Sequence, residues 1–293
     1  MHLLTCLSLV FTTFLWGGTF VAGRQLAGSV APEHAAFLRF VIGSAVLLLL
    51  LLAKEKRLQL PPPRLWLPLF LLGLTGVFAY NVFFFKGLHY ISAGRASLFI
   101  ASTPLVITLL GAALLLEKLT FAKGCGVITS LMGAVIVISN GHPAELFSGI
   151  FGPGEFALIG CVISWSAYSL IGRSVLKSMT PLSSVCYSSI IGTLLLLPPA
   201  IHTDLFSRVG SLTPRDWLNL SYLGILGTAV GFSLYYRGIE KIGATRASVF
   251  INLVPVFALL LAWVILDESI KPAVLVGGLL VLCGVTIANY RRQ

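Results

Sequence analysis

Long apolar segments alternate with short polar connections along the whole chain. Each segment has about twenty mostly apolar residues, which is the length that a tilted helix needs to cross roughly 30 Å of hydrocarbon. No connection is long enough to form an extramembrane domain. The pattern therefore predicts an all-α integral membrane protein with ten transmembrane helices, at residues 3–22, 34–53, 66–85, 94–116, 122–139, 154–172, 182–201, 217–236, 245–266 and 272–290.

The second half of the sequence repeats the first half. Arg95-Ala96-Ser97-Leu98-Phe99-Ile100 recurs 151 residues later as Arg246-Ala247-Ser248-Val249-Phe250-Ile251, and each copy continues to a proline and then a glutamate. Five spans in each copy place the second copy upside down relative to the first, an arrangement typical of secondary transporters. We therefore expect two inverted five-helix repeats, residues 1–140 and 154–293, joined by a linker at residues 141–153.

Glycines recur in the last span of each repeat. Gly126 and Gly133 correspond to Gly277 and Gly284, with the same spacing of seven residues in both copies. Small residues at a helix interface let two backbones approach closely. We expect spans 5 and 10 to pack on each other as a scaffold.

Composition and charge agree with a membrane protein. Hydrophobic residues make up 57% of the 293 residues and charged residues only 10%, whereas about a quarter of an ordinary soluble domain is charged. Thirteen basic residues fall in the connections on one side and six on the other, so the net charge of +10 reflects topology rather than a nucleic-acid-binding face. This asymmetry predicts that both termini are cytoplasmic. We expect the first span to be retained, because it lacks the basic leader of a signal peptide.

Several motifs, taken together, resemble one known family. They are Leu15-Trp16-Gly17-Gly18-Thr19-Phe20, Phe37-Leu38-Arg39-Phe40, the two Arg-Ala-Ser stretches, and Pro104 to Glu117 with Pro255 to Glu268. Over essentially the whole chain they resemble the EamA family of the drug/metabolite transporter superfamily. The resemblance implies a ten-span exporter of small metabolites such as amino acids, in the bacterial inner membrane. It also implies a central cavity lined by spans 1, 3, 4, 6, 8 and 9. The second repeat departs from the first by having Ser188 where Arg39 stands.

Spans 4 and 9 each carry a stripe of small or polar side chains on one helix face. Close helix packing and a cavity wall both explain such a stripe. Each central proline would leave one carbonyl unbonded near mid-membrane, that of Ile100 or Ile251, and such carbonyls beside Asn252 would suit a substrate ammonium group. The stripes are Ser97, Ala101, Pro104, Thr108 and Gly111, and Ser248, Asn252, Pro255, Leu259 and Ala262.

Aromatic residues lie deep in the spans. Trp16 and Trp165 occupy equivalent positions inside spans 1 and 6, where a buried indole N–H needs a partner and favours a polar cavity. Tyr80, Tyr235 and Tyr236 lie nearer span ends, so anchoring at the membrane interface explains them equally well. Positions at which the repeats differ fit either an asymmetric substrate or sequence drift. The candidate substrate-binding residues are Trp16, Thr19, Tyr80, Asn81, Ser97, Ile100, Ala101, Pro104, Trp165, Tyr168, Ser248, Ile251, Asn252 and Pro255.

Arg39 lies about five residues inside the second predicted span, about 8 Å below the outer surface by the rise of a helix. Either it extends its guanidinium to the interface, or it attracts a carboxylate or phosphate at the outer mouth as a gating charge. Arg95, Arg246, Glu117 and Glu268 flank spans 4 and 9 and are expected to anchor span boundaries.

The function predicted is secondary transport rather than catalysis. The sequence has no nucleophile–His–acid set, metal-binding motif or P-loop, its five cysteines are scattered singly, and we expect no cofactor or metal. No Asp, Glu or His falls at mid-span, so we expect facilitated diffusion or exchange rather than proton coupling. The expected partners are a small-molecule substrate and the lipid bilayer, and a monomer is compatible with the sequence. A phosphorylated-solute exchanger and a membrane-embedded enzyme are the alternatives. Trp165→Ala or Asn252→Leu is expected to abolish transport and leave folding intact.

Overall fold

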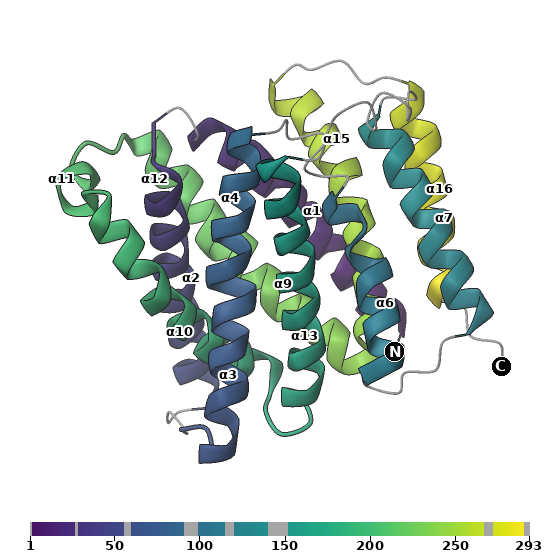
Figure 1. Cartoon of the computed structure of the whole chain (residues 1–293), viewed down its shortest axis with the longest axis horizontal. Coiled ribbons are helices and arrows are strands. Elements are labelled where there is room, and N and C mark those ends of the chain that lie inside the picture. The colour runs from purple at the N-terminus through teal and green to yellow at the C-terminus, as the bar shows by residue number, and fades with distance from the viewer. Residues whose placement is uncertain are drawn as a thin grey trace.

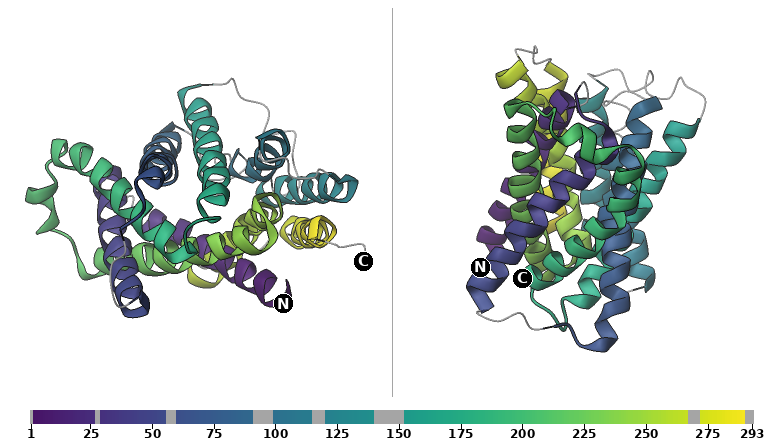
Figure 2. Two further views of the ribbon diagram at one scale, coloured as in Figure 1. Left: turned by 90° about the horizontal axis from the view of Figure 1, so that it is seen from below. Right: turned by 90° about the vertical axis from the view of Figure 1, so that its left-hand side faces the viewer.

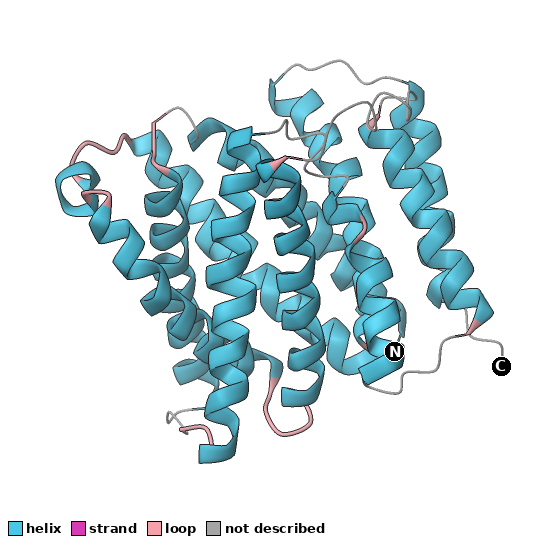
Figure 3. Ribbon diagram, viewed as in Figure 1, coloured by secondary structure: helices cyan, strands magenta, loops and turns pink. Residues whose placement is uncertain are grey.

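The computed structural model describes residues 2–26, 29–55, 60–90, 99–114, 120–139, 152–266 and 272–289. Within these ranges the chain is helical and has no strand (Figure 3). The first half contains α1 (His2–Leu26), α2 (Pro32–Glu55), the 3₁₀ turn η1 (Pro63–Leu65), α3 (Trp66–Leu72), the π-helix η2 (Gly73–Ala79), α4 (Tyr80–Tyr90), α6 (Thr103–Leu114) and α7 (Phe121–Ile138). The second half contains α9 (Pro153–Val175), α10 (Pro181–His202), α11 (Leu205–Val209), α12 (Pro214–Ser221), the π-helix η3 (Tyr222–Val230), α13 (Gly231–Ile242), α14 (Ala244–Val249), the 3₁₀ turn η4 (Phe250–Leu253), α15 (Val254–Leu266) and α16 (Pro272–Asn289).

The prediction of an all-helical membrane protein is confirmed. In the described part of the chain, seven helical stretches are long and apolar enough to cross a membrane. Three shorter apolar helices, Phe99–Leu114, Phe121–Ile136 and Leu275–Ala288, fall where spans 4, 5 and 10 were expected. Large apolar side chains are exposed along the outside of the bundle, including Leu49, Phe121 and Leu279. Such a surface is compatible with lipid and not with water.

Helix starts follow from local sequence. Prolines open α2, α9, α10, α12 and α16, because proline fixes φ and needs no hydrogen-bond acceptor in the first helical turn. Thr180 caps α10 by accepting from the Ser183 N–H at 3.2 Å. Thr213 and Asp216 form a reciprocal capping box at the start of α12. These caps satisfy N–H groups that an isolated helix end leaves without partners.

Helices of one half pack mainly on helices of the other half. α1 contacts α13 and α15, and in the same way α9 contacts α4 and α6. α2 lies against η3 and α10, while α10 lies against η2 (Figures 1 and 2). Each of these contacts of a first-half element is therefore matched by a contact of its second-half equivalent. The interior is formed jointly by both halves.

α7 and α16 form a separate pair at one edge of the bundle, as the different views show (Figures 1 and 2). A Cβ atom added to Gly126 would lie 2.6 Å from the Gly284 carbonyl oxygen, and one added to Gly133 would lie 2.6 Å from the Gly277 carbonyl oxygen. The two backbones are thus in direct contact at the four recurring glycines. The predicted close packing of these two helices is confirmed.

The two faces at which the helices end can be distinguished by the segments that lie there. On one face, Ser29 donates to Asp216 Oδ1 at 2.6 Å and Asn219 donates to Gln25 Oε1 at 3.1 Å, which ties the end of α1 to α12. The opposite face carries the start of α1 and the connection between α9 and α10. We call this opposite face the N-terminal face.

Candidate functional site

Trp16 and Trp165 meet at the centre of the bundle. Their ring centroids are 5.3 Å apart and their planes are nearly perpendicular, at 86°. Phe232 contacts both indoles edge-on, at 6.0 and 5.3 Å, and Tyr235 contacts both at 5.3 and 5.8 Å. Edge-to-face contacts of this kind add attraction beyond the burial of apolar area. We call these four residues the aromatic cluster. It brings together α1, α9 and α13.

Tyr80 and Tyr168 extend the aromatic cluster, since both contact Trp165. Their ring centroids lie 5.1 and 5.3 Å from that of Trp165. Tyr168 is fully buried, whereas Tyr80 and Thr19 are only partly buried. The predicted site residues in α1, α4 and α9 are therefore neighbours in space.

The π-helices shape the contacts of the aromatic cluster. Trp16 Nε1 donates a hydrogen bond of 2.9 Å to the carbonyl of Gly227, inside η3. A Cβ atom at Gly76, inside η2, would lie 2.2 Å from the Tyr168 ring. A Cβ atom at Gly227 would lie 2.8 Å from Thr19 Cγ2. π-helical segments often occur at functional sites, and here glycines in them let the aromatic side chains approach.

Several buried polar atoms near this centre have no hydrogen-bond partner among the described residues. They include Trp165 Nε1, the Tyr168 hydroxyl and Asn81 Oδ1. The Asn81 amide nitrogen is occupied, because it donates to the Val77 carbonyl at 2.6 Å. An orphaned polar atom in a protein interior requires an explanation. A bound polar ligand is one explanation that fits three such atoms around one cluster.

The candidate residues of span 9 take different positions. Asn252 is fully buried in η4 and donates from Nδ2 to Ser130 Oγ on α7 at 2.9 Å, so it ties the second half to the predicted scaffold. Ser248 donates to the Thr245 carbonyl at 2.9 Å. Asn252 Oδ1 has no partner among the described residues. Asn252 Oδ1 is therefore a polar atom that a ligand can reach without breaking a hydrogen bond of these two side chains.

The expectation of an unbonded Ile251 carbonyl is wrong. Residues Phe250–Leu253 form a 3₁₀ turn, and the Val254 N–H donates to the Ile251 carbonyl. Pro255 is the second residue of the helix that starts afresh at Val254, a position that proline tolerates well. Pro104 is likewise the second residue of α6, which begins at Thr103.

The remaining candidates of span 4 belong to the apolar interior. Ala101 is buried in the main hydrophobic core, and Ile100 packs against that core from a partly buried position. Ser97 lies outside the described residues, as do Arg95, Glu117 and Glu268.

Arg39 lies inside the bundle. Its Nη2 donates to Thr228 Oγ1 in η3 at 3.3 Å, and its guanidinium carbon lies 4.9 Å from the centroid of the Phe40 ring. Phe40 in turn contacts Phe232 of the aromatic cluster at 6.0 Å. The guanidinium is thus bonded within the protein rather than extended along lipid to the interface.

Sequence reasoning gave too little weight to α13. Tyr235 and Tyr236 are 1% and 0% exposed, so they do not anchor the protein at the membrane interface. The Tyr235 hydroxyl hydrogen-bonds Ser169 at 3.1 Å, and the Tyr236 hydroxyl donates to the Tyr168 carbonyl at 3.1 Å. Their equivalents in the first repeat are Phe84 and Phe85. This difference between the repeats is the signal that could have found them.

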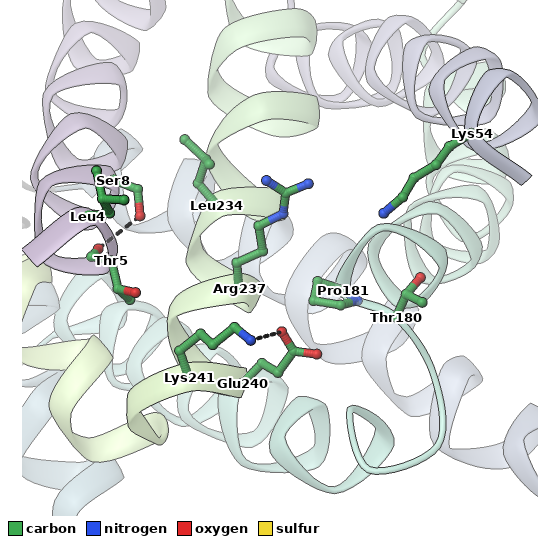
Figure 4. A pocket seen from close by; sticks show the side chains of 10 residues that line it. All are labelled: Leu4, Thr5, Ser8, Lys54, Thr180, Pro181, Leu234, Arg237, Glu240 and Lys241. Atoms are coloured by element: carbon green, nitrogen blue, oxygen red, sulfur yellow. Dashed lines mark hydrogen bonds and ion pairs between the residues drawn. The ribbon is translucent and has the colours of Figure 1, made fainter. Parts of the chain in front are cut away.

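A pocket of about 520 Å³ opens on the N-terminal face, between α1, α2, α10 and α13 (Figure 4). Lys54 and Arg237 point toward its middle, and Lys241 pairs with Glu240 at 4.0 Å. Leu234 also lines the pocket, next in sequence to Tyr235 of the aromatic cluster. The sequence had indicated these basic residues only as markers of topology. The pocket is lined by Leu4, Thr5, Ser8, Lys54, Thr180, Pro181, Leu234, Arg237, Glu240 and Lys241.

Comparison with known proteins gives a consistent result. The model of a family described as the EamA-like transporter family matches residues 3–139 and again residues 152–290. The uncharacterized transporter YyaM of Bacillus subtilis (strain 168) is 27% identical over 290 residues, which cover 98% of this chain and 94% of that protein. A probable terminal-alkyne amino-acid exporter of Streptantibioticus cattleyicolor is 30% identical over 288 residues, which cover 97% of this chain and 93% of that protein. A solved crystal structure with 26% identity superposes with a TM-score of 0.79, covering 97% of this chain and 96% of the other.

Proposed function

Because the chain belongs to the EamA-like transporter family, we propose that it exports small metabolites, most simply amino acids with aromatic or hydrophobic side chains. The observation that carries this proposal is the aromatic cluster formed by Trp16, Trp165, Phe232 and Tyr235 in the middle of the bundle. Indole and phenol rings present apolar faces together with a few polar atoms. Similarity to a probable amino-acid exporter supports the same substrate class.

The proposed architecture is ten transmembrane helices in two inverted repeats, residues 1–140 and 154–293, with residues 141–153 as the linker. The matched contacts of α1 and α9, and of α2 and α10, support it. So does the recurrence of a π-helix at equivalent positions, η2 and η3. Transport would then proceed by alternating access, as one repeat moves against the other around the central cluster.

The proposed location is the cell membrane, with both termini in the cytoplasm. The N-terminal face would then be cytoplasmic, and the pocket there would be the entry for a substrate to be exported. Lys54, Arg237 and Lys241 line this pocket, in agreement with the excess of basic residues found on cytoplasmic sides of membrane proteins.

The cationic pocket also favours a second candidate, a phosphorylated-solute exchanger. Three basic residues against one acidic residue would attract a phosphate ester. These groups lie at the N-terminal face, however, and Lys241 is already paired with Glu240. Next to the aromatic cluster, Arg39 is the cation that the described residues provide. One cation suits a monoanion better than a phosphate dianion.

The test is efflux from proteoliposomes that contain the purified protein. Vesicles are loaded with a labelled amino acid, either phenylalanine, leucine or serine, or with a hexose phosphate. We expect the protein to accelerate loss of phenylalanine and leucine more than loss of serine or hexose phosphate, relative to protein-free vesicles. Acceleration of hexose phosphate alone would favour the exchanger. Loss of all four at the rate of protein-free vesicles would refute both candidates.

A further inference from the structure

Arg39 has no carboxylate partner among the residues that the structure describes. Its contacts there are the hydrogen bond from Nη2 to Thr228 and the stacking over Phe40. Nε is buried and has no acceptor in the described part of the chain. A guanidinium in the interior of a membrane protein is normally paired or serves a function, because burying an unpaired charge is unfavourable.

Thr228 fixes the position of this charge. Its hydroxyl donates to the Leu223 carbonyl at 3.0 Å, five residues back, so its oxygen is free to accept from Arg39. The acceptor five residues back belongs to the π-helix η3. Thr228 therefore positions Arg39 and has no further proton to offer a ligand.

The place that corresponds to this one when the two repeats are exchanged is built differently. Ser188 stands in place of Arg39, Val77 in place of Thr228, and Tyr168 in place of Thr19. Ser188 is fully buried, and its hydroxyl donates to the Val185 carbonyl at 3.1 Å. One of the two corresponding places thus contains a buried tyrosine, while the other contains a cation and a smaller side chain.

The surroundings of Arg39 combine charge with aromatic surface. Arg39 reaches the aromatic cluster through Phe40, which contacts Phe232 at 6.0 Å, and the ring of Tyr80 contacts Trp165 at 5.1 Å. Arg39, Thr19 and Tyr80 are all partly buried, in contrast to the fully buried Tyr168 and Tyr236. The positive charge therefore belongs to the less deeply buried part of these surroundings.

We infer that Arg39, positioned by Thr228, binds the carboxylate of the substrate, whose apolar part lies against Tyr80 and the aromatic cluster. The substrate class is then a monocarboxylate with an apolar or aromatic side chain, and an amine without a carboxylate is excluded. This inference rests on the proposed function, since it names the group by which an exported metabolite is recognised. A guanidinium suits this role, because its planar N–H groups match the geometry of a carboxylate.

The test compares three ligands that differ only in their charged groups: phenylalanine, 3-phenylpropionate, which lacks the amine, and phenethylamine, which lacks the carboxylate. Competition against labelled phenylalanine is measured on purified protein in lipid nanodiscs. Arg39→Gln is the test variant, and Arg208→Gln, at an exposed position in α11, is the matched control. For the wild type and the control, we expect 3-phenylpropionate to compete at least about tenfold better than phenethylamine.

In Arg39→Gln, affinity for phenylalanine and 3-phenylpropionate is expected to fall on the order of 10- to 100-fold, and that for phenethylamine to stay unchanged. The unfolding temperature of ligand-free Arg39→Gln, compared with that of the wild type, separates a binding role from a structural role. If Arg39 serves binding, removing its unpaired buried charge leaves the unfolding temperature unchanged or raises it. Unchanged phenylalanine affinity in Arg39→Gln overturns the inference, as does a wild type that binds phenethylamine as well as phenylalanine. In both cases the proposed amino-acid export stands. If the wild type binds none of the three ligands, the proposed substrate class and the inference both fail.

Discussion

Trp16 and Trp165 occupy equivalent positions in the two halves of the chain and pack edge-to-face with ring centroids 5.3 Å apart. They differ in one respect. The indole N–H of Trp16 is bonded to the Gly227 carbonyl at 2.9 Å, whereas that of Trp165 has no acceptor among the described residues. A repeat that is symmetric in sequence is thus asymmetric in hydrogen bonding at its centre. Two substitutions can measure what each indole contributes to stability and to transport.

Trp16→Phe and Trp165→Phe remove similar volume from the same cluster, but only Trp16→Phe breaks a hydrogen bond. We expect Trp16→Phe to lower the free energy of unfolding by about 1 kcal/mol more than Trp165→Phe, because it removes the buried hydrogen bond to the Gly227 carbonyl. Trp165→Phe should instead raise the KM for the exported amino acid, since its N–H is available to a ligand. Thermal unfolding in detergent and transport kinetics measure the two effects. Equal destabilisation with unchanged KM would contradict the assignment.

These phenylalanine variants replace the alanine variant expected from sequence. Trp165 is 7% exposed and contacts several aromatic rings, so Trp165→Ala would create a large void. Such truncations typically lower stability by about 3–5 kcal/mol. Loss of transport in Trp165→Ala would therefore not separate binding from folding.

Asn252 and Ser130 join η4 to α7, and their contributions are expected to be coupled. Since Asn252 Nδ2 donates to Ser130 Oγ at 2.9 Å in a buried setting, we expect Asn252→Leu and Ser130→Ala to show a coupling energy of about 1 kcal/mol in a double-mutant cycle. Thermal unfolding of the two single variants and the double variant gives this value.

Transport measurements on the same variants test whether Asn252 also contacts the substrate. If its unpartnered Oδ1 contacts the substrate, Asn252→Leu reduces transport well beyond Ser130→Ala. Equal loss of transport in both variants would mean that Asn252 acts only by holding α7 in place.

The contact between α7 and α16 was predictable, because close backbone approach depends on side-chain size alone. The sequence indicates this contact by four recurring glycines, and the structure places their backbones in contact: Gly126, Gly133, Gly277 and Gly284. The apolar segments were predictable for a similar reason, since about twenty residues must be apolar wherever a helix crosses hydrocarbon.

The hydrogen-bond register was not predictable from residue types. Pro255 removes one helical hydrogen bond, and the sequence alone suggested that the Ile251 carbonyl is left unbonded. The chain instead forms a 3₁₀ turn, so that the Val254 N–H donates a hydrogen bond to the Ile251 carbonyl. The π-helices η2 and η3 likewise depend on how η2 packs on α10 and η3 on α2. The bond between Arg39 and Thr228, 189 positions apart, depends in turn on η3.

Gly284→Ala should destabilise the protein strongly compared with Gly278→Ala in the same helix. A Cβ atom at Gly284 would lie 2.3 Å from the Ser130 backbone nitrogen, whereas at Gly278 the nearest atom, Val256 Cγ1, is 3.5 Å away. Forcing the backbones apart is expected to lower the free energy of unfolding by about 1–3 kcal/mol. Fluorescence-detected size-exclusion chromatography after heating measures the folded fraction of each variant. A Gly278→Ala variant as unstable as Gly284→Ala would show that general crowding around the helix, and not this interface, sets the effect, since alanine by itself favours a helix more than glycine does.

Transport is expected to be independent of a pH gradient. The acidic residues that the structure describes lie at or near element ends, with Glu33, Glu155 and Asp216 in first turns and Glu240 near the end of α13. Proton-coupled transporters usually carry an ionisable relay within the membrane, and Arg39 stays charged over the physiological range. Proteoliposomes with equal labelled amino acid on both sides and an imposed pH gradient should therefore show no net accumulation. A substrate gradient at equal pH serves as the positive control, since it must drive flux in the same vesicles. Accumulation that follows the pH gradient and collapses with a protonophore would require a proton-binding group in the translocation path.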